Sequence, residues 1–74
     1  MHYRRIKELR EDADKNQKEV SQYLWIAQRT YSSYETGTRH IPTDILCRLT
    51  DYHHTSVDYL LGRTDEKKPY PPAK

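Results

Sequence analysis

Several features are scarce in this 74-residue sequence, and each shortage excludes a class of protein. The single cysteine, Cys47, cannot form a disulfide within the chain, so the fold must depend on packing in a reducing environment. Only two glycines are present, and they form no glycine-rich loop for nucleotide phosphates. No apolar run approaches the roughly 18 residues of a membrane-spanning helix. Residues 2–5 lead into alternating charge, so we expect no signal peptide and a cytoplasmic location.

The length allows one small domain. Domains of this size bury roughly 60% of the surface that their unfolded chains expose, so the core must be small. This excludes a doubly wound sheet and a deep catalytic cleft between domains. Serines are plentiful, but none lies in the strand–turn–helix elbow of a nucleophile. We therefore expect a non-enzymatic protein that needs no cofactor.

The residues that could bind a metal lack the required spacing. Cys47, His53 and His54 stand near one another, but the paired cysteine and histidine patterns of zinc sites are absent from the sequence. We expect Cys47 to be a small core or near-surface residue. The two histidines should be half-buried or exposed, and no metal site is expected.

The net charge of +2 is small, but it is unevenly distributed. Residues 1–10 carry +3 and residues 63–74 carry +2, whereas residues 11–19 and 44–62 each carry −2. Such asymmetry suits a polyanionic partner, yet a solvated surface of mixed charge gives nearly the same pattern. Charge alone therefore favours a polyanion only slightly.

Apolar periodicity predicts an all-α chain with no strand, whose helices cover about residues 3–13, 17–24, 28–36, 42–53 and 56–61. Asn16, followed three residues later by Glu19, predicts a capping box at the start of the second helix. Pro42 and Ser56 are suited to open two further helices. Gly37 is suited to end the third.

The apolar positions of these helices should meet in one core. We expect a single cluster formed by Ile6, Leu9, Val20, Leu24, Tyr31, Tyr34, Leu46, Leu49 and Leu60. After them, the sequence is charged and rich in proline and has no apolar face, which is typical of a disordered or extended segment. The sequence thus predicts a folded domain over residues 1–62 and a tail over residues 63–74.

The stretch from Gln17 to Tyr34 carries the most information about function. Its apolar residues and the small Ser21 are spaced for two helices that cross steeply through a short turn. The second of these helices would bury Tyr31 and Tyr34. Its polar outer side would consist of Gln28, Arg29, Ser32 and Ser33.

That outer side has the chemistry of a base-reading surface. An α-helix fits the major groove of B-form DNA, where arginine pairs with guanine and glutamine pairs with adenine. Helices that carry such side chains near their N-terminal half can read base edges. Any solvent-facing helix side is also polar, so both interpretations stay open on this evidence.

Six segments carry a further signal: RIKELR (5–10), NQKEV (16–20), RTYSSYETG (29–37), RHIP (39–42), ILCRLTDY (45–52) and SVDYLLGRTD (56–65). In this order and at these separations they resemble the Xre/Cro-type helix-turn-helix regulators, over about residues 5–65. The last segment looks like many such regulators of Gram-positive bacteria and their mobile elements. The resemblance implies a compact five-helix, lambda-repressor-like bundle. It also implies a sequence-specific DNA-binding transcriptional regulator, most often a repressor.

The resemblance implies roles for individual residues as well. The helix at 28–36 would read bases in the major groove through Gln28, Arg29, Ser32 and Ser33. Phosphate contacts would come from Gln17, Thr36, Thr38, Arg39 and His40. Arg10 and Glu35 would form a structural ion pair between the first helix and the end of the recognition helix. From the residues alone, two solvated charges are the simpler interpretation of that pair.

The same resemblance implies a partner and an assembly. The partner would be double-stranded DNA with a twofold-symmetric operator, bound by a homodimer whose recognition helices enter major grooves about 34 Å apart. Lys67 and Lys68 could touch phosphate, although a solvated tail is the stronger expectation. We expect no membrane partner.

A second hypothesis is a protein-interaction module, such as an antitoxin or an anti-regulator partner. The polar outer side of the helix at 28–36 favours DNA over protein, because protein interfaces concentrate aromatic and apolar anchors. We identify no second domain that could sense a small molecule. The chain is therefore either a short regulator or part of a longer one.

A few positions depart from the family pattern. Trp25 stands where the turn usually has glycine, and a left-handed backbone there costs another residue about 1 kcal/mol or more. We expect its indole to be partly buried against the neighbouring helices; the alternative is an exposed aromatic that contacts a partner. Ala27 replaces the usual capping hydroxyl. Lys15, His53 and Thr55 replace frequent apolar residues, which predicts a thin core and marginal stability.

Overall fold

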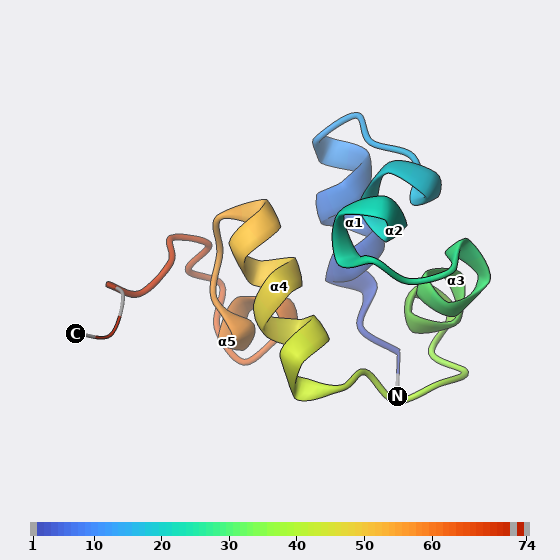
Figure 1. Ribbon diagram of the computed structural model, residues 1–74. Helices are drawn as coiled ribbons and strands as arrows, with labels where there is room; N and C mark the ends of the chain where they lie inside the picture. Colours follow the sequence, from blue (N-terminus) through green and yellow to red (C-terminus); the bar gives the residue numbers. More distant parts are fainter. Residues whose placement is uncertain (1, 72, 74) are drawn as a thin grey trace.

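The computed structural model describes residues 2–71 and 73, and over these residues the chain forms five helices and no strand (Figure 1). The helices are α1 (Arg4–Asp12), α2 (Gln17–Leu24), α3 (Gln28–Thr36), α4 (Thr43–His53) and α5 (Val57–Leu60). α1, α2 and α3 gather on one side of the molecule, and α4 and α5 lie on the other (Figure 1). The expected all-α, five-helix fold is confirmed, and each helix boundary lies within one residue of its expected position.

Local capping signals set several of the helix ends. The Asn16 side chain accepts from the Glu19 N–H at 2.8 Å, and the Glu19 carboxylate accepts from the Asn16 N–H at 3.1 Å, which closes the capping box. Ser56 caps α5 through its hydroxyl oxygen, and Gly37 ends α3 in a left-handed conformation. Pro42 is the N-cap of α4 and precedes its first turn.

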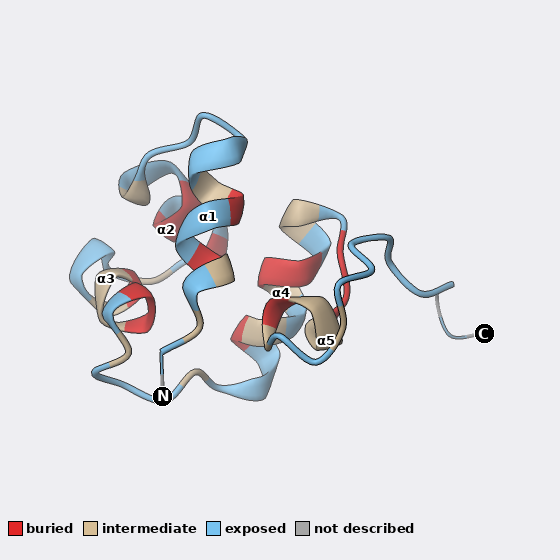
Figure 2. Cartoon of the chain, turned by 180° about the vertical axis from the view of Figure 1, so that it is seen from behind, coloured by how far each residue is buried: buried red, intermediate tan, exposed pale blue. Residues whose placement is uncertain are grey.

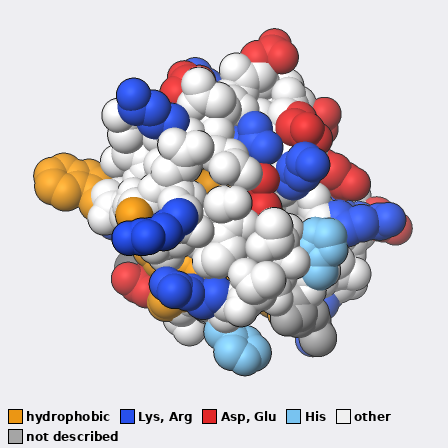
Figure 3. Space-filling model, turned by 90° about the vertical axis from the view of Figure 1, so that its right-hand side faces the viewer, with side chains coloured by type: hydrophobic (Ala, Val, Ile, Leu, Met, Phe, Trp, Pro, Cys, Tyr) orange, Lys and Arg blue, Asp and Glu red, His pale blue; other side chains and the backbone are white. Residues whose placement is uncertain are grey.

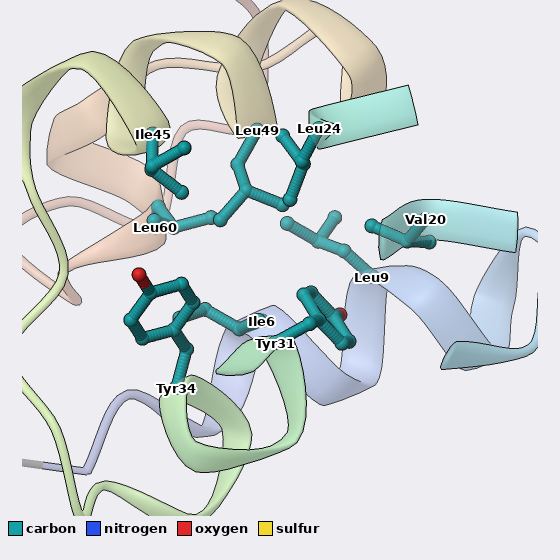
Figure 4. Packing of buried hydrophobic residues seen from close by; sticks show 9 residues of the cluster. All are labelled: Ile6, Leu9, Val20, Leu24, Tyr31, Tyr34, Ile45, Leu49 and Leu60. Carbon is teal, nitrogen blue, oxygen red and sulfur yellow. The ribbon is translucent and has the colours of Figure 1, made fainter. Parts of the chain in front are cut away.

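One apolar cluster takes side chains from all five helices (Figure 4). Its buried members are Ile6, Leu9, Val20, Leu24, Tyr31, Tyr34, Ile45, Leu49 and Leu60. The expected core is confirmed except in α4, where Ile45 is 6% exposed and Leu46 packs only at the edge of the cluster. The prediction of a buried Leu46 was wrong. Ile45 stands one turn before Leu49, so these two residues share the inward face of α4 and Leu46 lies beside that face.

The crossing of α2 and α3 rests on a small buried residue, Ser21. Its hydroxyl donates to the carbonyl oxygen of Lys18 at 2.9 Å, so it needs no further partner in the interface. Figure 2 shows buried residues on the inward sides of both helices and exposed residues on their outer sides. This arrangement leaves the outer side of α3 open to another molecule.

The segment that follows α5 has no regular secondary structure, but several hydrogen bonds join it to the helical body, two of them donated by side-chain hydroxyls. The Thr55 hydroxyl donates to the carbonyl oxygen of Lys67 at 2.7 Å. The Tyr70 hydroxyl donates to the Asp58 carboxylate at 2.7 Å. The expected division into a folded domain and a tail stays a prediction, and tail residues 72 and 74 lie outside the described residues.

The described helices are also short. α4, with 11 residues, is the longest of them, and none of the five has the length and apolar character needed to cross a membrane. Within residues 2–71 no three histidine, cysteine, aspartate or glutamate side chains gather as a metal site would require. Cys47 and His54 are exposed, and His53 is half-buried.

Candidate nucleic-acid interface

The turn between α2 and α3 holds these helices in a fixed relation. Trp25 adopts the left-handed conformation, with φ 60° and ψ 41°. Its N–H donates to the carbonyl oxygen of Gln22 at 3.2 Å, and the N–H of Ile26 donates to that of Ser21 at 3.1 Å. These bonds occupy the free carbonyls at the end of α2, so the turn is tied down although a tryptophan stands in a position that favours glycine.

The indole of Trp25 is 87% exposed, so the expectation of partial burial was wrong. The residues on either side of it explain the outcome. Leu24 is buried in the core, and Ile26 packs against the core from the other side. Because these two side chains take the inward positions of the turn, the indole between them is left pointing outward.

The four residues expected to read bases lie together on the outer side of α3. Gln28 and Arg29 are exposed on its first turn, and Ser32 and Ser33 are half-buried one turn later. The Ser33 hydroxyl donates to the Thr30 carbonyl oxygen at 2.6 Å, so only its acceptor side faces outward. Figure 3 views the molecule from the side on which α3 lies, and there a surface of uncharged polar side chains and backbone is bordered by Lys and Arg side chains, with Asp and Glu side chains at the upper right.

The end of α3 and the loop after it bring together the expected phosphate-binding residues Thr36, Thr38, Arg39 and His40, all of them exposed. The hydroxyls of Thr36 and Thr38 lie 3.3 Å apart. Gly37 between them has φ 80°, and backbone and side-chain atoms of His2 lie 3.0 Å from the place that a Cβ there would occupy. Both observations require glycine at this position, and they place the N-terminal segment beside the loop.

Glu35 is 4% exposed and accepts hydrogen bonds from two other helices. Its carboxylate oxygens lie 2.6 Å from Nε and 3.2 Å from Nη2 of Arg10 in α1. The Gln17 side-chain amide, at the start of α2, donates to the same carboxylate at 3.0 Å. The structure therefore joins Arg10 and Glu35 directly. It also places Gln17, expected at a phosphate, against this pair with one amide hydrogen already engaged.

The surroundings of Glu35 keep it ionised. Burial tends to raise the pKa of its carboxyl, but the hydrogen bonds from Arg10 and Gln17 prevail and the pKa lies below its ordinary value. Burial, reinforced by the nearby Glu35 carboxylate, raises the pKa of the Tyr31 phenol. The hydrogen bond to Glu35 raises the pKa of Arg10, so the pair stays charged at neutral pH.

Two residues near Gln17, the cationic Lys7 and the polar His2, were not identified as site residues from the sequence. A hollow of about 480 Å³ lies beside Gln17, and its lining includes His2, Lys7 and Thr36. Lys7 and His2 are exposed there, next to residues expected to contact phosphate. The excess of positive charge in residues 1–10 was the available signal, but charge alone does not say which side chains face α2 and α3.

Comparisons with known proteins show which proteins this chain resembles. A family model described as helix-turn-helix matches residues 6–60. The HTH-type transcriptional regulator ImmR of Bacillus subtilis (strain 168) is 38% identical over 65 residues, which cover 88% of this chain and 51% of ImmR. AnsR, another HTH-type transcriptional regulator of that strain, is 36% identical over 73 residues, covering 99% of this chain and 63% of AnsR.

A third relative from the same strain, the uncharacterized HTH-type transcriptional regulator YobD, is 32% identical over 69 residues. That similarity covers 93% of this chain and 62% of YobD. The chain thus spans between 51% and 63% of the length of these three relatives. No solved structure matches the chain.

Proposed function

Because the chain belongs to the helix-turn-helix family, we propose that it is a transcriptional regulator that binds specific sequences in double-stranded DNA. The membership confirms the resemblance seen in the sequence segments. The observation that carries the proposal is the polar outer side of α3, which is held at a fixed angle by the buried crossing with α2. The proposal gives the chain no catalytic step and no cofactor, and it places the protein in the cytoplasm.

In this proposal, α3 enters the major groove. Arg29 and Gln28 are the longest side chains of its first turn and reach furthest toward base edges, where they can pair with guanine and adenine. Ser32 and Ser33, one turn later, meet the next base edges or a thymine methyl group. These four residues set the sequence preference.

Residues at the two flanks of α3 would bind the DNA backbone. The end of α3 and the loop after it supply the hydroxyls of Thr36 and Thr38, the positive charge of Arg39 and the imidazole of His40. Gln17 retains one amide hydrogen that can reach a phosphate oxygen while the other donates to Glu35. Lys7 stands beside Gln17 and adds a positive charge to this phosphate site.

We further propose that two copies bind a twofold-symmetric operator. Recognition helices about 34 Å apart enter successive major grooves on one side of the duplex. Occupancy of such an operator in a promoter would block polymerase, so repression is the simplest outcome. The exposed indole of Trp25 favours one other function, a module that binds protein, such as an antitoxin or an anti-regulator partner.

The test is a titration of wild-type protein, Arg29→Ala and Arg39→Ala against a duplex selected from random DNA and a scrambled duplex, each at several salt concentrations. Arg29→Ala should lose about 1–3 kcal/mol on the selected duplex and relax the preference at one base pair. Arg39→Ala should weaken both duplexes about equally and reduce the salt slope by about one. Arg63→Ala, an exposed arginine after α5, removes the same charge and serves as the matched control.

Sequence-specific binding requires that the wild type prefer the selected duplex and lose affinity as salt rises. If the wild type binds both duplexes equally, or neither, the proposal fails and the protein-binding function takes its place. If Arg63→Ala weakens binding as much as Arg39→Ala does, only the net charge of the chain matters and the loop after α3 has no special role.

A further inference from the structure

The side chain of Trp25 has no role within the fold. It is 87% exposed, more than any other large apolar residue among those described. Its left-handed backbone is a conformation that glycine adopts more easily. A tryptophan that is exposed at a position better suited to glycine is available for contact with another molecule.

The position of Trp25 points to the same molecule that α3 reads. The residue lies three positions before Gln28, at the leading end of the recognition helix, and its backbone is fixed by the hydrogen bonds of the turn. Ala27, the N-cap of α3, offers no side-chain acceptor to the first backbone N–H groups of that helix. The helix end next to the indole therefore attracts anions.

The stretch of sequence that contains the indole, residues 20–34, carries positive charge and no negative charge. No acidic residue occurs in the sequence between Glu19 and Glu35, whereas Arg29 follows the turn. Arg48 of α4 donates to the carbonyl oxygen of Tyr23 at 2.9 Å, which holds a second guanidinium at the end of α2. A surface that combines an apolar ring with cations matches the DNA backbone, where deoxyribose is apolar and phosphate is anionic.

We propose that Trp25 is a DNA-contact residue whose indole packs on the sugar–phosphate backbone just outside the base pairs that α3 reads. Gln28 stands at the end of the base-reading row, so a side chain that precedes it meets the duplex beyond that row. The indole N–H can donate to a phosphate oxygen and replace the contact that a hydroxyl at Ala27 would make. This contact reads no base edge and strengthens binding to every sequence. The inference rests on the proposed function and adds a residue to its DNA surface.

Trp25 is the only tryptophan in the sequence, so its fluorescence reports on this contact directly. Binding is followed by the anisotropy of a dye-labelled duplex, and acrylamide quenching of the indole is measured in the same titration. We expect the indole to become protected as the duplex binds, with both signals saturating at the same protein-to-DNA ratio. A duplex trimmed to the last base pair of the selected site should bind but leave the indole accessible.

Two variants distinguish the contribution of the indole ring to DNA affinity from that of its N–H group. Trp25→Gly fits the left-handed backbone and should melt no lower than the wild type, yet it should bind selected and scrambled duplexes about tenfold more weakly with the same preference between them. Trp25→Phe keeps an apolar ring and loses the donor, so its affinity should be intermediate. Tyr70→Ala removes another exposed aromatic side chain, 65% exposed and away from α3, and should leave DNA binding unchanged.

Different experimental outcomes would overturn this inference and the proposed function. If the wild type binds the selected duplex while its indole stays accessible to acrylamide and Trp25→Gly binds equally well, the inference is overturned and the proposed function stands. If the wild type binds no duplex, the proposed function fails and the inference falls with it. If the indole becomes protected with rising protein concentration in the absence of DNA, it packs against a second copy of the chain, and the inference is overturned in favour of self-association.

Discussion

At the scale of single residues, the buried carboxylate of Glu35 is the point at which α1, α2 and α3 meet. Arg10 and Gln17 supply its hydrogen-bond donors, and neither is adjacent to it in sequence. A buried ion pair adds little net stability compared with an apolar replacement, but removing one partner strands the other and costs about 3–5 kcal/mol. Glu35 therefore fixes how three helices are arranged more than it adds to the total stability.

The lowered pKa of Glu35 predicts an acid-sensitive fold. The pKa of the folded carboxyl lies below its ordinary value of 4.5, so the stability that the ionised form contributes is complete above about pH 4.5 and is lost as pH falls through the folded pKa. Glu35→Gln should lower the free energy of unfolding at pH 7 by about 3 kcal/mol and weaken its decline below pH 4.5. Urea denaturation curves recorded at about every half pH unit between pH 3 and pH 7 measure both effects.

Glu8→Gln is the matched control, because Glu8 is an exposed carboxylate on α1. Its loss should leave both the stability and the pH dependence close to those of the wild type. Equal pH profiles for wild type and Glu35→Gln would show that the carboxylate at position 35 is not the group that titrates.

The residues of the site show what could be predicted from the sequence. Charges separated by 25 positions, like Arg10 and Glu35, give no periodic signal, so only the family resemblance suggested that they pair. The bond from Gln17 to Glu35 was not predicted, because it depends on the angle between α2 and α3. The exposure of Trp25 was predicted wrongly, because an apolar residue favours burial unless its neighbours already occupy the inward positions.

At the scale of helices, the starts that depend on local contacts were the most predictable. The capping box of Asn16 and Glu19 closes within four residues, so the sequence contains all of its parts. The inward face of α4 was less predictable. Ile45 and Leu46 stand four and three positions before Leu49, and both spacings suit one helical face. Figure 4 shows Ile45 directed toward Leu60 of α5, a contact that no pattern within α4 could specify.

The cap of α2 predicts a measurable loss. Asn16→Ala leaves the Glu19 N–H without its acceptor and should lower the free energy of unfolding by about 1 kcal/mol. Asn16→Asp keeps an acceptor at the same place and should stay close to the wild type. Urea denaturation of the three proteins measures the difference, and a loss as large for Asn16→Asp as for Asn16→Ala would mean that the amide of Asn16, rather than its acceptor oxygen, matters.

At the scale of the whole molecule, Arg5 connects the first helix to α5 and to the segment that follows it. Its guanidinium donates to the carbonyl oxygens of Tyr59 at 2.8 Å and Thr64 at 2.6 Å, and to the Asp65 carboxylate at 2.7 Å. It also stacks on the Tyr59 ring, 4.1 Å from the ring centroid. Composition could not reveal this connection, because a charged, proline-rich segment has no apolar face and Arg5 reaches it through one backbone carbonyl and one carboxylate.

These contacts predict that Arg5 and the segment after α5 stabilise the fold as a unit. Arg5→Lys keeps the charge but loses the forked geometry, and it should lower the free energy of unfolding by about 1–2 kcal/mol. A chain ending at Gly62 should lose a similar amount, and combining the two changes should cost less than their sum by about 1 kcal/mol. Urea denaturation of the four proteins measures this coupling, with a chain ending at Lys68 as the control that keeps every Arg5 contact. If the two losses simply add, Arg5 acts through Tyr59 alone and the segment after α5 stabilises the fold through its other bonds, such as the one that Lys67 accepts from Thr55.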